Sequence, residues 1–453
     1  MSRQLFGTDG IRGVAGTPPL DKRTAHALGV ALGTWARQGA APPADGSPHE
    51  VLIGMDTRES GPWLAAQVAG GLSRVHVEAR FAGITTTPGV AYLTRTGPFA
   101  AGVMISASHN PYYDNGLKVI SHSGYKLADA VELELEKLMA EWLNKNEEAM
   151  EKRLTVDRTL DHLYTNYLAG TVSGQFPFRL VIDCANGSAT EIAPALFQRL
   201  GAEVDWVGST PDGRNINLDC GSLHLENLQR RVIETKADLG IAFDGDADRA
   251  LFVSGSGKIV DGDAVLFLAG SFLKRAGKLP GNTVIATVMS NLGLQKALEA
   301  HGIEMVRTPV GDKYVLEEML KRGAVLGGEQ SGHVIFSDYA TTGDGLLTAV
   351  RLLEIVRESG GTLDELVNEI KSYPQKLVNV RVKHRRPLTE LDSVQAEIQA
   401  AEREFAGSGR VVVRFSGTEP LARVMIEGPS HQEVDKWTGR IAEAIRTELG
   451  AAG

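Results

Sequence analysis

One order of segments constrains the fold of this chain more than any other feature of its sequence. Three times, a short β-prone run is followed by a helix-like stretch and a second apolar run, which ends in a polar, glycine-containing loop. The first runs begin at Val51, Arg179 and Asn282, and the loops contain SASHNP, DGDADR and GEQSGH. Strands that alternate with helices in this way are typical of an open α/β sheet. Residue identities hardly match between the copies, so the repeat is one of architecture.

The pattern changes near residues 373–374, where three strand-like runs are accompanied by helix-prone stretches at 389–405 and 431–448. The acidic helical segment 128–152 is expected to link the first two repeats. We therefore predict three similar α/β domains with mixed sheets and a C-terminal α+β domain, at residues 1–155, 156–257, 258–371 and 372–453.

The composition argues against several classes of protein. A net charge of −9 makes nucleic acid an improbable main partner, because phosphate backbones require a basic surface. Cys184 and Cys220 are too few for a disulfide framework and lack the spacing of a zinc site. The longest apolar run, 264–273, is far shorter than the ~20 residues that span a bilayer. The N-terminus has no apolar core of a signal peptide, so we expect a cytoplasmic protein.

The loop DGDADR carries the sharpest chemical signal. Asp244, Asp246 and Asp248 stand at alternate positions directly after an apolar run, which would bring three carboxylates together as Mg²⁺ requires. An EF-hand would need Gly and Glu where Arg249 and Gly255 stand. A solvated acidic turn is the other alternative, but carboxylates gathered at the end of a buried strand repel one another without a cation.

The other loops are less specific by themselves. The hydroxyls and turn formers of ISASHNPYYDNGLK, residues 105–118, suit either a functional loop at a strand end or a plain polar turn. Glu329, Ser331 and His333 could bind the hydroxyls of a sugar, although a structural loop would look the same. In RFSGTEPLAR, hydroxyls and backbone N–H groups between two arginines are typical of a phosphate cradle; the candidates are Arg414, Ser416, Gly417, Thr418 and Arg423.

Taken together, these motifs resemble the α-D-phosphohexomutase superfamily over nearly the whole chain. The resemblance rests on FGTDGIRG at 6–13, SASHNP at 106–111, DGDADR at 244–249, GEQSGH at 328–333 and SGTEP at 416–420. It implies four domains around a central active-site cleft, each contributing one loop. Two positions depart from the family pattern: Phe415 lies beside the phosphate loop, and Lys313 stands where arginine is common.

The resemblance also implies a role for each residue. Ser108 would carry a phosphoryl group, whereas Ser106 would not be the nucleophile. One Mg²⁺ would be held by a phosphoserine oxygen and three carboxylates, from Ser108, Asp244, Asp246 and Asp248. Proton transfer and charge stabilisation would fall to His109 and Lys118, and contacts to the phosphoryl group to Arg12 and Arg249. The substrate would be bound by Glu329, Ser331, His333, Arg414, Ser416, Gly417, Thr418 and Arg423.

The implied reaction moves phosphate between the 6- and 1-hydroxyls of a hexosamine through a bisphosphorylated sugar, which also acts as activator. The Gly-Thr of FGTDGIRG, Gln330 and the Thr of SGTEP favour an aminosugar over mannose or glucose phosphates. Gln330 could add a hydrogen-bonding partner near the sugar loop. A phosphomannomutase or phosphoglucomutase remains the first alternative, and a serine phosphotransferase or phosphatase the second. A homodimer is expected from the family.

Overall fold

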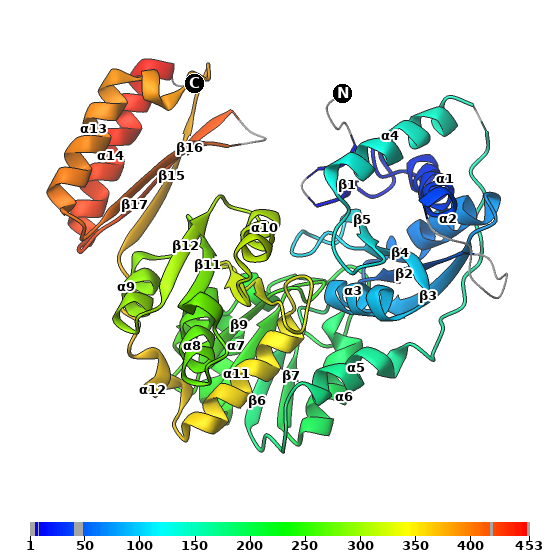
Figure 1. The fold of residues 1–453 in the computed structure, drawn as a ribbon, viewed down its shortest axis with the longest axis horizontal. Coiled ribbons are helices and arrows are strands. Elements are labelled where there is room, and N and C mark those ends of the chain that lie inside the picture. The colour runs from blue at the N-terminus through cyan, green and yellow to red at the C-terminus, as the bar shows by residue number, and fades with distance from the viewer. Residues whose placement is uncertain (1–4, 8, 40–48, 146, 417–419, 451–453) are drawn as a thin grey trace.

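The computed structural model describes residues 5–7, 9–39, 49–145, 147–416 and 420–450. Its domains follow one another along an arc in Figure 1, with the first domain (blue to cyan) and the fourth (orange to red) at the two ends. The predicted architecture, three α/β domains and a C-terminal α+β domain, is confirmed by the four sheets. The exact domain boundaries stay predictions.

The first domain contains a five-stranded sheet in the order β1-β5-β4-β2-β3. β2 pairs in parallel with β3 and β4, and β5 pairs antiparallel with β4 and β1. Its elements are β1 (Ile11–Val14), α1 (Lys22–Gly39), β2 (Glu50–Met55), α2 (Gly61–Arg74), β3 (Glu78–Ile84), α3 (Thr87–Thr96), β4 (Phe99–Ile105), β5 (Asp114–Ser121) and α4 (Asp129–Leu143).

Helices cover both faces of this sheet, which explains why its strands are apolar throughout. Successive side chains of a strand point to opposite faces. In β2, Val51 and Ile53 pack in one cluster with α1, α2 and α4, whereas Leu52 packs in a second cluster with α3. A strand buried on both sides becomes a continuous apolar run rather than an alternating one.

The second and third domains repeat the strand order of the first. The order is β10-β9-β8-β6-β7 in the second sheet. In the third it is β14-β13-β11-β12, which matches β5-β4-β2-β3 of the first sheet and has four strands. The second domain has α5 (Asp161–Gly170), β6 (Arg179–Asp183), α6 (Ala189–Leu200), β7 (Glu203–Val207), α7 (Glu226–Thr235), β8 (Leu239–Phe243), β9 (Ala250–Ser254) and β10 (Ile259–Val260). The third has α8 (Gly262–Arg275), β11 (Thr283–Thr287), α9 (Leu292–Ala300), β12 (Glu304–Thr308), α10 (Asp312–Arg322), β13 (Leu326–Gly328), β14 (Val334–Phe336), α11 (Gly345–Ser359) and α12 (Leu363–Val367).

The three polar loops occupy the same topological position in these domains. Each follows the last parallel strand, β4, β8 or β13, and returns as an antiparallel neighbour, β5, β9 or β14. Ile105 thus pairs with Leu117, Phe243 with Ala250, and Gly328 with Val334. The loops therefore emerge at the carboxyl ends of parallel strands, where open sheets place their binding sites.

The helical part of segment 128–152, which was expected to link the first two repeats, packs as part of the first domain. α4 packs against α1, and its Leu135, Met139 and Trp142 are buried in the core of the first domain. Their spacing of four and three residues places them on one helix face, so this helix belongs to the domain. Its acidic residues had favoured the interpretation as a linker.

The fourth domain is a three-stranded antiparallel sheet, ordered β15-β17-β16, with two helices packed against it (Figure 1). The elements are β15 (Gln375–Arg381), α13 (Asp392–Phe405), β16 (Arg410–Phe415), β17 (Leu421–Glu427) and α14 (His431–Leu449). Arg410 joins it to the third domain by donating to the Ser290 carbonyl at 2.9 Å. Among the described residues, no helix is both long and apolar enough to cross a membrane.

Candidate active site

The loops of the first three domains meet at one point. Ser108 Oγ, in the loop between β4 and β5, donates to Asp244 Oδ2 at 2.6 Å. Ala250 N, at the end of the second loop, donates to the Gly332 carbonyl of the third at 3.1 Å. The first two loops approach so closely that a Cβ on Gly245 would lie 2.5 Å from the Ser108 carbonyl oxygen. Only glycine fits at position 245 in this arrangement.

Ser108 is held in a backbone conformation that side-chain-bearing residues seldom adopt. Its φ is 53°, in the left-handed region, and it is buried. Its Oγ lies 3.3 Å from Nδ1 of His109. Ser106 Oγ accepts from the backbone N–H of Ser108 at 2.9 Å and donates to Asp56 Oδ2 at 2.6 Å. The Ser106 hydroxyl is therefore committed to supporting the loop, while that of Ser108 faces the acidic cluster.

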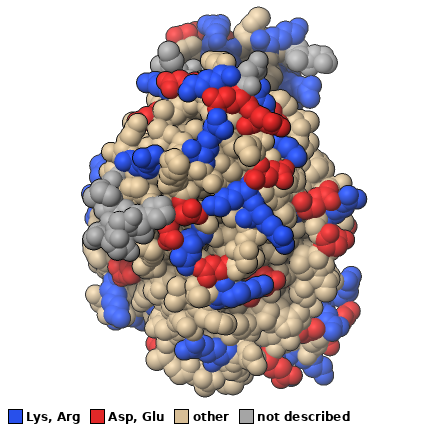
Figure 2. Space-filling view, turned by 90° about the vertical axis from the view of Figure 1, so that its right-hand side faces the viewer, with Lys and Arg blue, Asp and Glu red and all other residues tan. Residues whose placement is uncertain are grey.

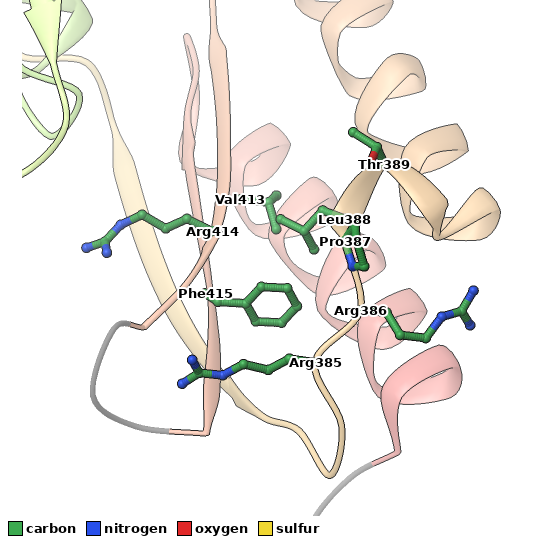
Figure 3. A pocket seen from close by; sticks show the side chains of 8 residues that line it. All are labelled: Arg385, Arg386, Pro387, Leu388, Thr389, Val413, Arg414 and Phe415. Atoms are coloured by element: carbon green, nitrogen blue, oxygen red, sulfur yellow. The ribbon is translucent and has the colours of Figure 1, made fainter. Parts of the chain in front are cut away.

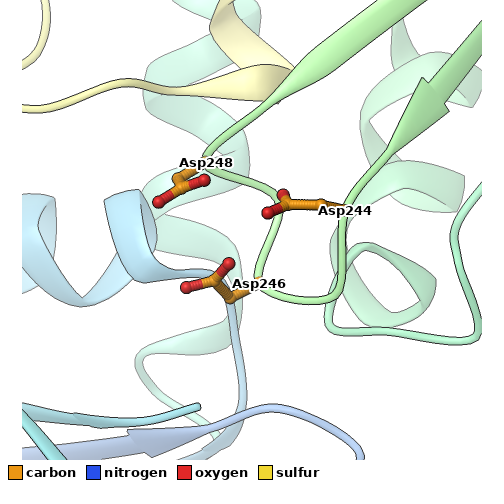
Figure 4. Close-up of side chains that lie close together, drawn as sticks. All are labelled: Asp244, Asp246 and Asp248. Carbon is orange, nitrogen blue, oxygen red and sulfur yellow. The ribbon is translucent and has the colours of Figure 1, made fainter. Parts of the chain in front are cut away.

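The three aspartates of the second loop form that cluster. Their side chains point into one common space in Figure 4, and one oxygen from each lies within 4.8 Å of the others. Asp244 and Asp246 are fully buried and the Asp248 side chain is 14% exposed, and burial together with the neighbouring carboxylates raises the pKa of Asp244 and Asp248. Within the described part of the chain, Asp246 Oδ1 and Asp248 Oδ1 are buried without a hydrogen-bond partner. Converging oxygens with unused lone pairs fit a divalent cation that prefers oxygen ligands.

Lys118 sets the charge of Asp246. Its Nζ lies 2.8 Å from Asp246 Oδ2 and 3.3 Å from Asp9 Oδ2. Burial would lower the pKa of Lys118, but these two carboxylates raise it well above its usual value. Burial would likewise raise the pKa of Asp246, but the Lys118 ammonium lowers it. Asp246 is thus an anion and Lys118 a fixed cation at neutral pH.

Asp9 forms ion pairs with three cationic side chains of the first domain. Besides Lys118, it pairs with Arg12 and with Lys126, whose Nζ lies 2.6 Å from its Oδ1. The Lys126 ammonium also lies 2.6 Å from Asp312 Oδ2, at the start of α10 in the third domain. Opposite charges in the described chain therefore tie the first domain to the metal loop on one side and to the third domain on the other.

Near Ser108, His109 is a neutral ring and Arg249 is a cation. Burial and the positive charges of Arg249 and Arg12 lower the pKa of His109 to about 4, so its ring is neutral at pH 7 and can accept a proton. Arg249 places its backbone N–H 3.2 Å from Asp244 Oδ1 and its Nε 3.8 Å from Asp248 Oδ1. The Asp248 and Asp244 carboxylates raise the pKa of Arg249 against the effect of burial.

The third loop presents buried polar atoms that make no hydrogen bond within the described part of the chain, although His333 Nε2 lies 3.9 Å from Asp312 Oδ2. His333 is buried, and within the described residues neither of its ring nitrogens, nor the Ser331 hydroxyl, has a hydrogen-bond partner. Glu329 accepts from the backbone N–H of Gly311 at 3.1 Å. Gln330 instead donates to Asp261 Oδ2 at 3.1 Å, so its amide anchors the loop to the start of α8. Buried polar atoms without partners are typical of a ligand site.

The fourth domain places Arg414 and Arg423 opposite each other on β16 and β17, and burial with this like charge lowers the pKa of Arg414. Ser416 is buried beside them, whereas Gly417 and Thr418 lie outside the described residues. Arg414 and Phe415 project to opposite sides of β16 (Figure 3). Phe415 turns toward Pro387 and Leu388, where it lines a cavity of about 510 Å³ within this domain. The departure at Phe415 therefore falls on the side away from Arg414.

Several residues of the site were not predicted from the sequence. Asp9 lies within FGTDGIRG, but its sequence neighbours do not indicate that it pairs with three cations. Arg58 lies three residues after the end of β2. Its guanidinium donates to the carbonyl of Ser108, about fifty residues further along the chain. Lys126 bridges two domains. Lys313, the other departure, pairs with Asp129 at 2.7 Å.

Comparison with known proteins agrees with this geometry domain by domain. Four phosphoglucomutase/phosphomannomutase models match the chain in order: the alpha/beta/alpha domains I, II and III at residues 3–146, 158–257 and 261–373, and the C-terminal domain at 377–444. The chain belongs to the phosphoglucomutase/phosphomannomutase family. The resemblance to the α-D-phosphohexomutase superfamily predicted from the motifs is confirmed.

Three relatives illustrate the match. Phosphoglucosamine mutase of Solibacter usitatus is 58% identical over 451 residues, which cover 99% of this chain and 100% of that protein. The structure of a phosphoglucomutase/phosphomannomutase family protein from Burkholderia thailandensis superposes with a TM-score of 0.79 at 26% identity, covering 99% and 98% of the two chains. That of Aspergillus fumigatus N-acetylphosphoglucosamine mutase with GlcNAc-6P and magnesium has a TM-score of 0.64 at 19% identity, covering 98% and 96%. At that identity, the last likeness concerns the fold alone.

Proposed function

We propose that this protein is a phosphoglucosamine mutase, an isomerase that interconverts glucosamine-6-phosphate and glucosamine-1-phosphate and so supplies amino sugar and peptidoglycan precursor synthesis. The observation that carries the proposal is the Ser108 hydroxyl, 2.6 Å from a buried carboxylate cluster, in a chain 58% identical to a phosphoglucosamine mutase over its full length. A nucleophile beside a cation site is the minimum that phosphoryl transfer requires.

The reaction consists of two phosphoryl transfers in opposite directions. In the first, the bond between phosphorus and Ser108 Oγ breaks while a bond forms to the free hydroxyl of the sugar phosphate. The proton of that hydroxyl is released, and Ser108 regains one. The resulting bisphosphate turns over in the site, and its other phosphoryl group returns to Ser108 by the same steps reversed. The net change is the position of the phosphate.

The chain's own residues divide the remaining tasks. His109 is the neutral base nearest to Ser108 Oγ, at 3.3 Å, and is placed to take up or return the proton. Lys118 keeps its proton and contributes a fixed positive charge. Arg12 and Arg249 would contact the transferring group, where guanidinium forks match phosphate oxygens. This assignment separates two roles that the sequence left shared between His109 and Lys118.

Asp244, Asp246 and Asp248 fit one Mg²⁺, together with an oxygen of phosphorylated Ser108. Two of these carboxylates have buried oxygens without a hydrogen-bond partner in the described chain, as expected of ligand atoms. When bound, the ion would offset negative charge on the transferring phosphoryl group. The solved Aspergillus fumigatus relative was captured with magnesium, in agreement with this assignment.

A second phosphate site favours a mutase over a serine phosphatase or phosphotransferase. A mutase must hold the idle phosphate of its substrate during each transfer, whereas a hydrolase gains little from a separate cradle. Arg414 and Arg423 face each other across β16 and β17 next to buried Ser416. We assign the idle phosphate to this group, together with Gly417 and Thr418, which the sequence predicts as members of the same cradle.

Replacing Arg423 with Ala should mainly raise KM. Because an idle phosphate is gripped equally in the ground state and the transition state, losing one guanidinium removes uniform binding. We expect KM to rise about 10- to 150-fold with kcat nearly unchanged, since a charged hydrogen bond contributes about 1.5–3 kcal/mol. Steady-state kinetics with glucosamine-6-phosphate measure this, and a loss confined to kcat would contradict the assignment.

The choice of sugar is tested by comparing glucosamine, glucose and mannose phosphates in one assay with Mg²⁺ and a trace of sugar bisphosphate. Glu329, Ser331 and His333 would bind the sugar. We expect kcat/KM to be highest for glucosamine-6-phosphate, by ~10²-fold or about 2.7 kcal/mol. Equal or better turnover of glucose or mannose phosphate would move the assignment to a phosphoglucomutase or phosphomannomutase. Gln330 donates to Asp261 through Nε2, so only its amide oxygen and second N–H could add to the discrimination by the other loop residues.

The surroundings of the protein are also proposed. On the face in Figure 2, Lys and Arg side chains are interspersed with Asp and Glu, which fits a protein whose partner is a small sugar phosphate rather than nucleic acid. We further propose a cytoplasmic homodimer, which size-exclusion chromatography with light scattering would test.

A further inference from the structure

Arg58 lies beneath the Ser108 loop with every donor of its guanidinium in use. The residue is 1% exposed. Its Nε donates to Asp56 Oδ2 at 2.9 Å, and its two terminal nitrogens donate to four carbonyl oxygens of the loop and of the strand that follows. The acceptors are the carbonyls of Ser108 (2.9 Å), Asn110 (2.8 Å), Pro111 and Asp114 (2.9 Å). A guanidinium has five N–H groups, so none is left for a phosphate.

These hydrogen bonds act on the part of the loop that is least stable by itself. Ser108 has a φ of 53°, a conformation that costs of the order of 1 kcal/mol for a residue with a side chain. From the second domain, Asn217 Nδ2 donates to the same two carbonyls, of Ser108 at 2.9 Å and of Asn110 at 3.1 Å. On the other side, Asp56 connects Arg58 to Ser106, which accepts the backbone N–H of Ser108.

We propose that Arg58 is a positioning residue for phosphoryl transfer, which fixes the left-handed turn at Ser108 so that its Oγ faces Asp244. The proposal rests on the function proposed above, in which Ser108 carries the phosphoryl group. Arg58 does not touch the substrate or the phosphoryl group. It acts through the loop backbone, and its contribution is geometric alignment, in which misplacement by about 1 Å can cost ~10²-fold in rate.

Lysine cannot replace arginine in this role, which makes Arg58→Lys an informative variant. An ammonium keeps the charge beside Asp56 but has three donors at one point, whereas Arg58 spreads five donors over a fork. It can therefore hold Asp56 or part of the loop, but not all the acceptors. Arg351→Lys is the matched control, because Arg351 is also buried, pairs with Glu354 at 2.7 Å and lies in α11.

The test uses full-length wild type, Arg58→Lys and Arg351→Lys, each phosphorylated with glucose 1,6-bisphosphate. Thermal unfolding establishes that each protein is folded, and mass spectrometry gives the phosphate on Ser108. We expect Arg58→Lys to lower kcat with glucosamine-6-phosphate about 100-fold while KM changes less than threefold. Single-turnover transfer from Ser108 to the sugar should slow equally, while loss of phosphate to water does not. Arg351→Lys should change the unfolding temperature alone.

Asn217→Gly provides a second test if Arg58→Lys does not fold. It removes the other donor to the same carbonyls and relieves the positive φ of 58° at Asn217. We expect a fall in kcat of about tenfold at constant KM, since one hydrogen bond to the loop is lost at each carbonyl. Unchanged transfer rates in a folded, phosphorylated variant would overturn the positioning role alone. A wild type that neither accepts phosphate on Ser108 nor turns over sugar phosphates would overturn the proposed function as well.

Discussion

Ser108→Ala is expected to remove nearly all mutase activity, by about 10⁴-fold or more, without unfolding the protein. The reason is positional as well as chemical, because the hydroxyl of Ser106, two residues away, is fixed between Asp56 and the backbone of residue 108. The variant should also take up no phosphate from a sugar bisphosphate. A coupled assay, intact mass measurement and thermal unfolding of the same preparation test the three parts of this expectation.

Ser106→Ala is the matched control for the nucleophile. It leaves the buried N–H of Ser108 without its partner, which costs about 1–3 kcal/mol, while Asp56 Oδ2 still accepts from Arg58 Nε. We expect a folded enzyme that keeps substantial turnover, reduced by about tenfold, and that still becomes phosphorylated. If Ser106→Ala were inactive and Ser108→Ala active, the assignment of the nucleophile would be wrong.

Asp246→Asn is expected to lower kcat by about 10²–10³-fold and to weaken binding of Mg²⁺. A neutral amide removes the negative charge that faces the metal position and that pairs with Lys118 at 2.8 Å. Without the Asp246 charge to offset it, the Lys118 ammonium would repel Mg²⁺. Activity measured against Mg²⁺ concentration, with calorimetric titration of the metal, separates weaker binding from slower chemistry.

Asp364→Asn is the matched control for charge and stability. Asp364 binds Ser254 and Ser256 at the opposite end of β9 from the acidic loop, so its loss should leave metal affinity unchanged. EDTA should inactivate the wild type, and added Mg²⁺ should restore it. Full activity in EDTA, or a metal affinity of Asp246→Asn equal to that of wild type, would contradict the metal assignment.

The sequence revealed the repeated order of strands and loops but not the full content of each repeat. The first and third strands, such as β6 and β8, were visible because they are buried apolar runs. The edge strands between them were missed, together with the helices that follow. β7 and β12, EVDWV and EMVRT, are short and half-buried, so their hydrophobic signal is weak. Here, sheet pairing rather than local sequence decides the structure.

Much the same division applies to the site. The three aspartates could be predicted as a cation site from their own motif, whereas the roles predicted for Ser108 and for the third loop rested on the family resemblance. Arg58 and Asp9 could not be predicted, since their partners are far along the chain and include backbone carbonyls. Backbone acceptors leave no trace in residue identity. Only the fold brings these groups together.

Because the three hairpin loops occupy the same position in separate domains, each loop can be changed by mutagenesis on its own. The proposed nucleophile, the acidic cluster and the proposed sugar contacts lie in three separate loops, at 106–113, 244–249 and 329–333, and each loop joins a parallel strand to its antiparallel neighbour. Residues 329–333 can therefore be randomised to search for new sugar preferences while the sequences of the other two loops are kept. Gly332 should be kept, since a Cβ there would lie 2.4 Å from the Ala250 carbonyl oxygen. Because the Gly332 carbonyl accepts from Ala250 N at the end of the acidic loop, phosphorylation of Ser108 should be measured for each variant before its sugar preference is compared.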